Sequence, residues 1–382
     1  MYSHSAIHLT QQFIQYPTVS SAPIIEFASL LASMGEDIQG HVDIFQTNTH
    51  KQNVMVHFGP REESIALSGH MDVVPVDGQN WDVNPFSGEI QDDKLMGRGS
   101  CDMKAFIGIC YAVLAKIPRT KLRKGISLVW THDEEIGCVG ATNLVQQLQE
   151  KEIVLAPYML IGEPTDLQIF HHHGGHVTIE IIITGKPAHS SKPYLGISAN
   201  EWLFTCWTIV NEWKEWLDTQ ISPITNNTPV LNIAEIQSGS AINIVPEHAT
   251  MRIGLRPMPG HNTQNLLQYI QDKIVVLQEK ISAIGGSIEF RVPQQAPPMH
   301  TTLPHPIGDT IIQNHPHTIC TGAPFATDGG CFAQMDCKPI ICGPGSIDLA
   351  HKANEYVTID QMIQYEKLLE RIIHKHCIEV ST

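Results

Sequence analysis

Three short apolar runs in this chain each end in acidic or imidazole side chains, and this pattern limits the folds available to it. The runs IALSGHMD, ISLVWTHDEE and YMLIGEP end on His70 with Asp72, on Glu134 with Glu135, and on Glu163. Such runs, rich in β-branched residues and bounded by Gly or Pro, are typical of buried strands. In an open, mostly parallel sheet, ligands bind at the carboxyl ends of the strands. We therefore predict that these five side chains converge on one edge of a parallel sheet.

Two further residues fit the same edge. Asp102 lies in the loop GRGSCDMK before a predicted helix at 105–115, and His351 follows the apolar run PIICGPGSI. The set then contains two imidazoles and more carboxylates than one ion needs. Imidazole with carboxylate suits zinc, cobalt or manganese, and the surplus favours two ions that share a bridging carboxylate. A hydrolase with two metal ions is the class of protein that this pattern favours.

The spacing of two residue pairs indicates roles beyond direct metal binding. Glu134 and Glu135 are adjacent, so on an extended backbone one side chain can face a metal ion while the other faces what the ion activates. In His70-x-Asp72, the carboxylate can hold the imidazole that binds the ion. Any one of these residues alone is as readily explained as a solvated loop residue, so the prediction depends on the whole set.

Length and charge exclude several classes of protein. A chain of 382 residues that is 42% hydrophobic can bury a large core and exceeds a single small domain. It has 24 Lys and Arg against 39 Asp and Glu, a formal net charge of -15, so we expect no nucleic-acid partner. No apolar run reaches the roughly 18 residues of a membrane span. Nine cysteines without a CxxC pair indicate buried thiols in a reducing compartment, and we expect the cytoplasm.

The region from Gly175 predicts a separate domain inserted into the first. Its patterns predict a strand, a helix, two strands, a helix and a strand, at 176–185, 197–219, 229–237, 248–257, 263–283 and 286–292. This order is that of a ferredoxin-like unit. Because candidate ligands lie on both sides of it, we predict a discontinuous catalytic domain at 1–174 and 293–382, with the insert at 175–292. The proline-containing segment QQAPPM is the predicted return linker.

Six sequence blocks resemble one enzyme superfamily over nearly the whole chain: SGHMDVVPV, GRGSCDMK, THDEEIGCVGA, IGEPTDLQ, KPAHSSKPYLG and GPGSIDLAHKANEYV. The chain is similar to the co-catalytic zinc metallopeptidases, which include acetylornithine deacetylases, succinyl-diaminopimelate desuccinylases and carboxypeptidase-type exopeptidases. The motifs W-x-x-x-PF, RPMPG and GPGSI most resemble the acetylornithine deacetylases. The segment FATDGG, with Thr327 and Asp328, is closer to the desuccinylases, so the acyl group stays open.

The resemblance implies an α/β fold and a set of metal ligands. The catalytic domain would have the mostly parallel sheet of zinc exopeptidases, and the ferredoxin-like insert would be a lid and dimerisation domain. One divalent ion would be bound by His70, Asp102 and Glu163, and the other by Asp102, Glu135 and His351. Asp102 would bridge the two ions, which we expect to be zinc, with cobalt as the alternative.

The resemblance also implies roles for residues around the ions. Asp72 would orient His70, and Glu134 would be the general acid and base. A cis peptide bond would follow Asp102, before Met103.

Residues of the insert take part in the implied site as well. His189, in KPAHSS, resembles a histidine that reaches the active site of the neighbouring subunit, which implies a homodimer formed through the inserted domain. Asn243 and Arg256 resemble substrate-binding residues, and the Arg256 guanidinium suits an α-carboxylate. Thr327 is a further substrate-binding candidate.

The predicted function is metal-dependent removal of the acetyl group from a small N-acetyl amino acid. N-acetyl-L-ornithine is the first candidate, giving acetate and L-ornithine in arginine biosynthesis. The alternatives are a desuccinylase or dipeptidase of the same superfamily, an enzyme that uses one metal ion, and a non-catalytic binding protein on the same fold. Glu134 and the five intact ligand positions argue against the binding protein.

Overall fold

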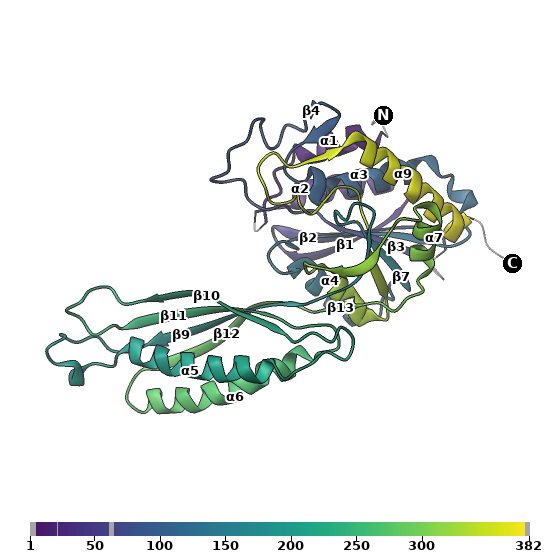
Figure 1. Cartoon of the computed structure of the whole chain (residues 1–382). Helices are drawn as coiled ribbons and strands as arrows, with labels where there is room; N and C mark the ends of the chain where they lie inside the picture. Colours follow the sequence, from purple (N-terminus) through teal and green to yellow (C-terminus); the bar gives the residue numbers. More distant parts are fainter. Residues whose placement is uncertain (1–4, 21, 61–64, 379–382) are drawn as a thin grey trace. The chain divides into compact units, whose positions relative to one another are not determined.

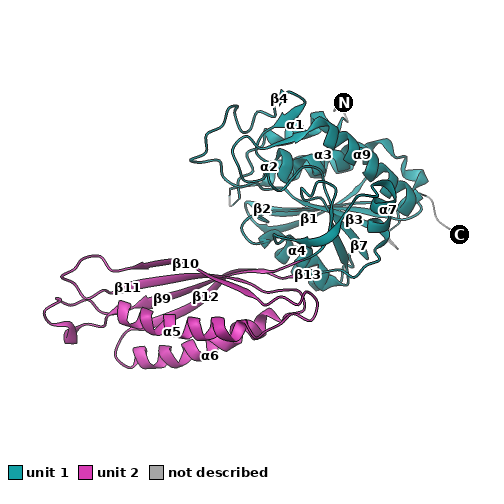
Figure 2. Cartoon of the chain, viewed as in Figure 1, with its two compact units in different colours: residues 1–172, 299–382 teal, residues 173–298 magenta. Residues whose placement is uncertain are grey.

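The chain forms two compact units in a computed structural model that describes residues 5–20, 22–60 and 65–378. Unit 1 comprises residues 1–172 and 299–382, and unit 2 comprises residues 173–298 (Figure 2). The insert predicted at 175–292 therefore begins two residues after unit 2 begins and ends six residues before unit 2 ends.

Unit 1 is built around a large sheet whose central strands are parallel. Nine strands of the described residues form it, in the order β1 (His41–Asn48), β2 (Lys51–Phe58), β6 (Ile126–Thr131), β3 (Ile65–His70), β7 (Tyr158–Ile161), β15 (Lys338–Ile341), β8 (Ile169–His173) and β13 (Met299–His300), with β14 (Cys320–Ala323) paired to β8. The pairs β6–β3, β3–β7 and β7–β15 are parallel. The pairs β1–β2, β2–β6 and β15–β8 are antiparallel. The predicted α/β fold with a mostly parallel sheet is confirmed.

The register of the parallel strands aligns the ends of the runs identified in the sequence. Ser68 of β3 pairs with Val129 of β6 on one side and with Ile161 of β7 on the other. Every residue of β3 and β6 is buried, as expected for strands that are covered on both faces. The residues that follow β3, β6, β7 and β15 therefore meet at one edge of the sheet.

Helices cover both faces of this sheet (Figure 1). One face carries α3 (Ala105–Lys116), which is apolar all round and buried from Ala105 to Leu114, as a helix inside a core must be. Four other helices share this core, namely α1 (Ala6–Ile14), α2 (Ile25–Asp37), α7 (Pro306–Asn314) and α9 (Ile359–Ile373). The opposite face carries α4 (Val139–Glu150), and the short helix α8 (Gly329–Phe332) contacts α4. No helix in the described ranges combines the length and apolarity of a membrane span.

A small sheet of unit 1 brings two loops of the candidate site together. It consists of β16 (Tyr356–Thr358), β5 (Lys94–Met96) and β4 (Ile90–Gln91). Tyr356 pairs with Met96, so the segment after His351 lies beside the segment that leads to Asp102. Short helical turns complete unit 1, at η1 (Ser100–Lys104), η2 (Arg119–Lys121), η4 (Ala333–Met335) and η5 (His374–Ile378).

Unit 2 is an antiparallel sheet with two helices packed on one face. Its strand order is β10 (Val230–Ser238), β11 (His248–Arg256), β9 (His176–Thr184) and β12 (Ser287–Ala296), and its helical segments are η3 (Pro193–Leu195), α5 (Ala199–Leu217) and α6 (Thr263–Ser282). Alternate residues of β9, from Val177 to Ile183, are buried in a core shared with α5 and α6. The β-α-β-β-α-β order predicted from the sequence is the order found.

The last strand of unit 2 is longer than the sequence predicts. β12 continues to Ala296, which pairs with His176 of β9. The prediction that QQAPPM is a linker is therefore wrong for its first three residues, which are part of the strand. Pro293 lies where the register shifts, between Arg291 and Gln294, on an edge strand. Bulges and edges are the positions at which a strand tolerates proline, so Pro293 does not end the strand.

Candidate metal centre

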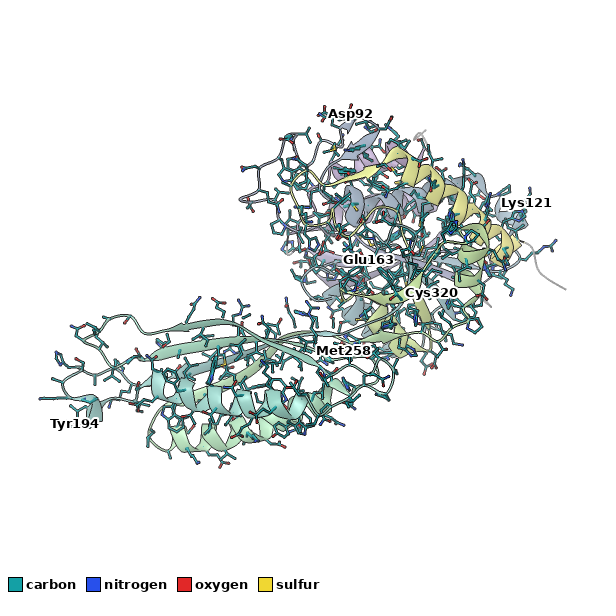
Figure 3. The ribbon with its side chains drawn as sticks, in the orientation of Figure 1. Asp92, Lys121, Glu163, Tyr194, Met258 and Cys320 are labelled. Carbon is teal, nitrogen blue, oxygen red and sulfur yellow. The ribbon has the colours of Figure 1, made fainter. Side chains whose placement is uncertain are left out.

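One edge of the sheet in unit 1 gathers the predicted metal ligands. His70 is the last residue of β3, Glu135 lies in the loop after β6, and Glu163 follows β7. His351 comes from the loop after β15, and Asp102 comes from the turn η1 that leads into α3. Glu163 is labelled in Figure 3 and marks the position of this centre.

Asp102 lies between the two imidazoles. Its Oδ1 is 2.9 Å from Nε2 of His70, and its Oδ2 is 3.3 Å from Nε2 of His351. Nε2 of His70 is also 3.8 Å from Oε1 of Glu163, and Nε2 of His351 is 2.9 Å from Oε2 of Glu135. Two atoms that bind one ion at about 2.1 Å lie roughly 3 to 3.5 Å apart in near-tetrahedral geometry. The separations fit ion binding beside Asp102. At this centre, the groups of three described residues whose ligand atoms all lie within 4.8 Å of one another are His70, Asp102 and Glu135, and His70, Glu134 and Glu163, so the predicted division of the ligands between two ions stays a prediction.

The charges at this centre also favour cations. Burial raises the pKa of Glu163, and the nearby Asp102 adds to the rise. Burial and Asp102 likewise raise the pKa of Glu135 to about 7, while hydrogen bonds with Asp102 and Glu135 raise the pKa of His351 to about 10. Buried carboxylates this close together are unfavourable unless cations neutralise them. The residues present therefore fit two divalent ions.

The backbone carbonyl of Asp72 forms a closer contact with His70 than the predicted carboxylate does. Nδ1 of His70 lies 2.9 Å from the carbonyl oxygen of Asp72, whereas Oδ1 of Asp72 is 3.7 Å away. A carbonyl oxygen can only accept a hydrogen bond, so Nδ1 of His70 donates and carries the proton. Nε2 is then left free to bind an ion.

The carboxylate of Asp72 holds the loop that follows β6. Its Oδ1 accepts a hydrogen bond from the backbone N–H of Glu134 at 3.0 Å, and its Oδ2 accepts one from that of Glu135 at 3.3 Å. The hydroxyl of Ser20 donates to Oδ2 at 2.8 Å. The same carboxylate lies 3.7 Å from Nδ1 of His70, so the role of Asp72 in orienting His70 stays a prediction. Asp72 positions the two glutamates.

Glu134 lies close to the first ion position. A side-chain oxygen of Glu134 is within 4.8 Å of the ligand atoms of His70 and Glu163. Burial raises the pKa of Glu134 well above its usual value, and the charge of Glu163 adds to the rise against the opposing effect of His70. A carboxyl with a raised pKa can both accept and return a proton near neutral pH.

The turn η1, which presents Asp102, has an irregular backbone. The peptide bond between Asp102 and Met103 is cis, as the resemblance implies. The next residue, Lys104, is fully buried, and its Nζ donates to the carbonyl oxygens of Phe13 at 3.0 Å and Tyr16 at 2.7 Å. These bonds attach the turn to the end of α1.

Glu355 holds the same turn from the other side, and no sequence pattern singled it out. Its Oε1 accepts hydrogen bonds from the backbone N–H groups of Gly99 at 3.0 Å, Cys101 at 2.9 Å and Asp102 at 3.1 Å. Its Oε2 accepts a bond from Arg98 at 2.6 Å, and both side chains are buried. A charged acceptor with this many donors fixes the backbone around the bridging residue. The indication that the sequence offered was the position of Glu355 in the block HKANEYV, close to His351.

The predicted site residues of unit 2 lie at opposite ends of its sheet. His189 and Asn243 are neighbours, because the N–H of Ser190 donates to the carbonyl of Asn243 at 3.0 Å. Both lie in exposed loops at the end where β9 finishes and β11 begins. Arg256 is at the other end of β11, which has nine residues, so roughly 27 Å of strand separates the two ends at about 3.4 Å per residue. Arg256 therefore cannot contact the same small substrate molecule as His189 and Asn243 of its own chain.

Thr327, the remaining substrate-binding candidate, is closed off from solvent. It is 0% exposed, and its hydroxyl accepts a hydrogen bond from the N–H of Gly329 at 3.1 Å. The contact of Thr327 with a substrate stays a prediction.

The fold and this centre together define a class of enzyme. A mostly parallel sheet presents two imidazoles and a bridging carboxylate at one edge, beside a carboxyl with a raised pKa, and this is the arrangement of a metal-dependent hydrolase. Residues 66–375 match the family model described as Peptidase family M20/M25/M40. The chain belongs to this family and is one of its metallohydrolases.

Relatives named acetylornithine deacetylase are similar over most of the chain. The one from Vibrio campbellii (strain ATCC BAA-1116) is 30% identical over 361 residues, covering 91% of this chain and 90% of the relative. The one from Pasteurella multocida (strain Pm70) is 28% identical and covers 98% of both chains.

Solved structures of the same family share the fold. The M20 family metallo-carboxypeptidase Sso-CP2 from Sulfolobus solfataricus has a TM-score of 0.78 at 18% identity, covering 97% of this chain and 99% of that one. The YXEP protein of Bacillus subtilis, described as a dinuclear metal-binding M20 peptidase, has a TM-score of 0.63 at 14% identity and covers 96% of both chains.

Proposed function

We propose that this chain is a deacylase with two divalent metal ions that hydrolyses N-acetyl-L-ornithine to acetate and L-ornithine. The observation that carries the proposal is the position of Asp102 between His70 and His351, with Glu134 beside them. The relatives named acetylornithine deacetylase support the acyl group and the substrate. The proposed setting is arginine biosynthesis in the cytoplasm, which the nine free thiols support.

The ligands would divide between two ion positions. His70, Asp102 and Glu163 would hold one ion, and Asp102, Glu135 and His351 would hold the other. Imidazole and carboxylate together suit zinc, with cobalt as the alternative. When bound, such ions supply Lewis acidity, which polarises the acyl carbonyl and lowers the pKa of water toward about 7.

Glu134 would carry the proton through the reaction. Amide hydrolysis needs a base that deprotonates the attacking water and an acid that protonates the departing amine. Glu134 is held in place through its backbone N–H by Asp72 at 3.0 Å. Its raised pKa supports both steps, because the same carboxyl can accept the water proton and then donate it to the amine nitrogen.

We propose that unit 2 completes the active site of a second copy of the chain. His189 and Asn243 are exposed neighbours that would donate hydrogen bonds to the developing oxyanion. β10 is an edge strand, and α5, which contacts it, exposes Phe204 at 71% and Trp207 at 39%. An edge strand beside exposed aromatic side chains is the kind of surface that a two-fold dimer buries.

Arg256 is the proposed partner of the α-carboxylate of the substrate. It is exposed at the end of β11, and its planar guanidinium offers paired donors that match a carboxylate. The roughly 27 Å between the ends of β11 supports a site in which Arg256 and His189 come from different chains.

Amine release from a substrate panel tests the proposed activity. The panel contains N-acetyl-L-ornithine, N-succinyl-diaminopimelate and small dipeptides, offered to chelated enzyme that has been reconstituted with zinc or cobalt. Metal-dependent turnover of N-acetyl-L-ornithine, lost in Glu134→Gln, is the expected result. Turnover of none of these compounds by metal-loaded enzyme would contradict the proposal and favour a binding protein.

A desuccinylase or a dipeptidase of the same family is the second candidate. The segment FATDGG, with Thr327 and Asp328, resembles the desuccinylase pattern and favours this alternative. Selective turnover of the succinyl compound or of dipeptides in the same panel would replace the proposed substrate while keeping the metal centre.

A further inference from the structure

A second group of potential metal ligands shares Glu134 with the first. Carboxylate oxygens of Glu134 and Asp328 and the sulfur of Cys138 all lie within 4.8 Å of one another. Sγ of Cys138 is 3.6 Å from Oε1 of Glu134. Cys138 and Asp328 are each 2% exposed. Because no cysteine is among the ligands of the two ion positions described above, this group has a distinct chemistry.

The starts of two helices place these side chains together. Cys138 directly precedes α4 and Asp328 directly precedes α8, and the two helices contact each other. The backbone N–H of Cys138 donates to the carbonyl of Glu134 at 2.9 Å. This turn returns the thiol toward the carboxylate four residues earlier, so the arrangement is fixed by backbone bonds.

One carboxylate oxygen of Asp328 has no hydrogen-bond partner within ordinary geometric limits among the described residues, and the nearby Cys138 thiol acts to lower the pKa of this carboxyl. Oδ2 of Asp328 accepts a hydrogen bond from the hydroxyl of Thr131 at 2.5 Å. Its Oδ1 is buried and accepts no hydrogen bond from the residues that the structure describes. An unpaired buried carboxylate oxygen is unfavourable, and a cation next to Glu134 and Cys138 would satisfy it.

The charges around the group also favour a cation. Burial raises the pKa of Asp328 to about 6. The hydrogen bond with Cys331, and then burial and the charge of Glu134, raise the pKa of the Cys138 thiol. A bound divalent cation reverses these effects, since its charge stabilises carboxylates and deprotonates a coordinating thiol.

We propose that Glu134, Cys138 and Asp328 form a third, inhibitory site for a thiophilic divalent cation such as zinc or cadmium. The cation binds one oxygen of each carboxylate and the Cys138 thiolate, and the thiol proton is released to solvent. Three protein ligands with a fourth position left to water is a common zinc arrangement. A cation bound to one oxygen of Glu134 lowers the basicity of this carboxylate, so Glu134 can no longer accept the water proton and hydrolysis stops. The inhibition rests on the proposed role of Glu134, whereas the binding does not.

Cobalt titration of the chelated full-length chain tests the binding directly. Thiolate coordination produces a charge-transfer band in the near ultraviolet, which imidazole and carboxylate ligands do not. We expect this band to grow in the wild type only after two equivalents of cobalt have bound. It should be absent from Cys138→Ser and retained in Cys320→Ser, which removes a half-buried thiol outside the group. No band in the wild type, or a band that persists in Cys138→Ser, would overturn the proposal.

A second variant covers a failure of Cys138→Ser to fold, which circular dichroism would reveal. Asp328→Asn keeps the thiol and removes one charged ligand. It should weaken the binding of the third cobalt ion by at least about tenfold, the scale of effect that ligand-shell changes have on metal affinity. An unchanged affinity of this ion in Asp328→Asn would contradict the assignment.

Turnover at rising zinc concentration tests the inhibition. Beyond two equivalents, zinc should inhibit the wild type, and Cys138→Ser should need at least about tenfold more zinc for the same loss of activity. Equal sensitivity of the two proteins would overturn the inhibitory role. If no panel substrate is turned over, the proposed function fails, and the cobalt titration still decides whether the third site exists.

Discussion

The metal centre of unit 1 and the exposed loops of unit 2 are held in opposite ways. His70 and Asp102 are buried, and backbone bonds from distant segments fix them, such as the three that converge on Glu355. His189 is exposed, and its imidazole lies 2.8 Å from the hydroxyl of Ser191, only two residues along the chain. The ligands of unit 1 are therefore arranged before an ion binds, whereas His189 of unit 2 is held by a local contact alone among the interactions described for its side chain. This difference agrees with the proposal that one chain suffices for metal binding and that a second copy completes the catalytic site.

The largest effect is expected from Glu134→Gln. Glutamine keeps the shape of the side chain but cannot exchange a proton, so kcat should fall by on the order of 10³. The metal content should stay at two ions per chain, because Glu134 is outside the proposed ligand sets. Steady-state kinetics with metal analysis measures both quantities, and Glu150→Gln, on the exposed side of α4, is the matched control. Loss of metal together with activity would instead make Glu134 a ligand.

The next largest effect is expected from His189→Asn in unit 2. Removal of one oxyanion donor should lower kcat by about 10², with the metal content unchanged because His189 lies outside unit 1. A changed metal content in His189→Asn, measured by metal analysis, would contradict the proposal that unit 1 alone binds the metal ions and that unit 2 donates to the oxyanion.

Mixing the two variants sharpens this second prediction. In a mixed dimer, the His189→Asn chain keeps its own Glu134 and receives an intact His189 from the Glu134→Gln chain. Random pairing in a two-fold dimer should therefore restore about a quarter of the wild-type activity. If His189 acts within its own chain, every mixed dimer lacks a complete site, and the mixture gains no activity.

A smaller effect is expected from Glu355→Gln, which tests the buried framework of unit 1. The change removes the negative charge that Arg98 and three backbone N–H groups share. The metal affinity should fall by about 10- to 100-fold, as it does when groups behind the ligands are changed. Competition with a chelator measures this affinity. Glu366→Gln on α9, which removes an ion pair with Lys116 of α3, should leave the metal affinity unchanged. An unchanged affinity in Glu355→Gln would show that the turn η1 is held without Glu355.

The sequence predicted best the residues whose place depends on a single strand. His70, Glu135 and Glu163 each follow a short apolar run, and the parallel register of β3, β6 and β7 brings the ends of these runs to one edge. The order of elements in unit 2 was predicted for the same reason, since alternation along β9 and the apolar faces of its helices are local patterns.

Bonds between distant segments could not be predicted from the sequence. Glu355 reaches the N–H of Asp102 across 253 residues, and the carboxylate of Asp72 accepts hydrogen bonds from backbone groups of the loop after β6. Every residue except proline carries a backbone N–H, so such partners leave no pattern. The length of β12 was missed because pairing with β9 continues past Pro293.

The smallest effect on stability is expected from Phe204→Glu, which tests the edge of unit 2 directly. Phe204 is 71% exposed, so the free energy of unfolding should change by less than about 0.5 kcal/mol. A two-fold interface would bring two such glutamates together, and their repulsion should leave a monomer. Light scattering measures the mass, and denaturant unfolding measures the stability. Val276→Glu, at a residue of α6 that is 48% exposed, places the same charge away from β10 and should leave the dimer intact.

The activity of the Phe204→Glu monomer decides between the two ways in which unit 2 can serve the centre. If His189 acts across the dimer, the monomer should keep both ions and show the roughly 10²-fold lower kcat of His189→Asn, because the donor is lost with the partner. A fully active monomer would mean that unit 2 serves the metal centre of its own chain. If Phe204→Glu is instead a fully active dimer, the interface does not depend on β10 and α5, and this result does not contradict an active site shared between two copies. Because the proposed metal ligands lie wholly in unit 1, none of these outcomes should alter the metal content. A changed metal content in Phe204→Glu would mean that unit 2 contributes to metal binding, contrary to the proposed separation of roles between the two units.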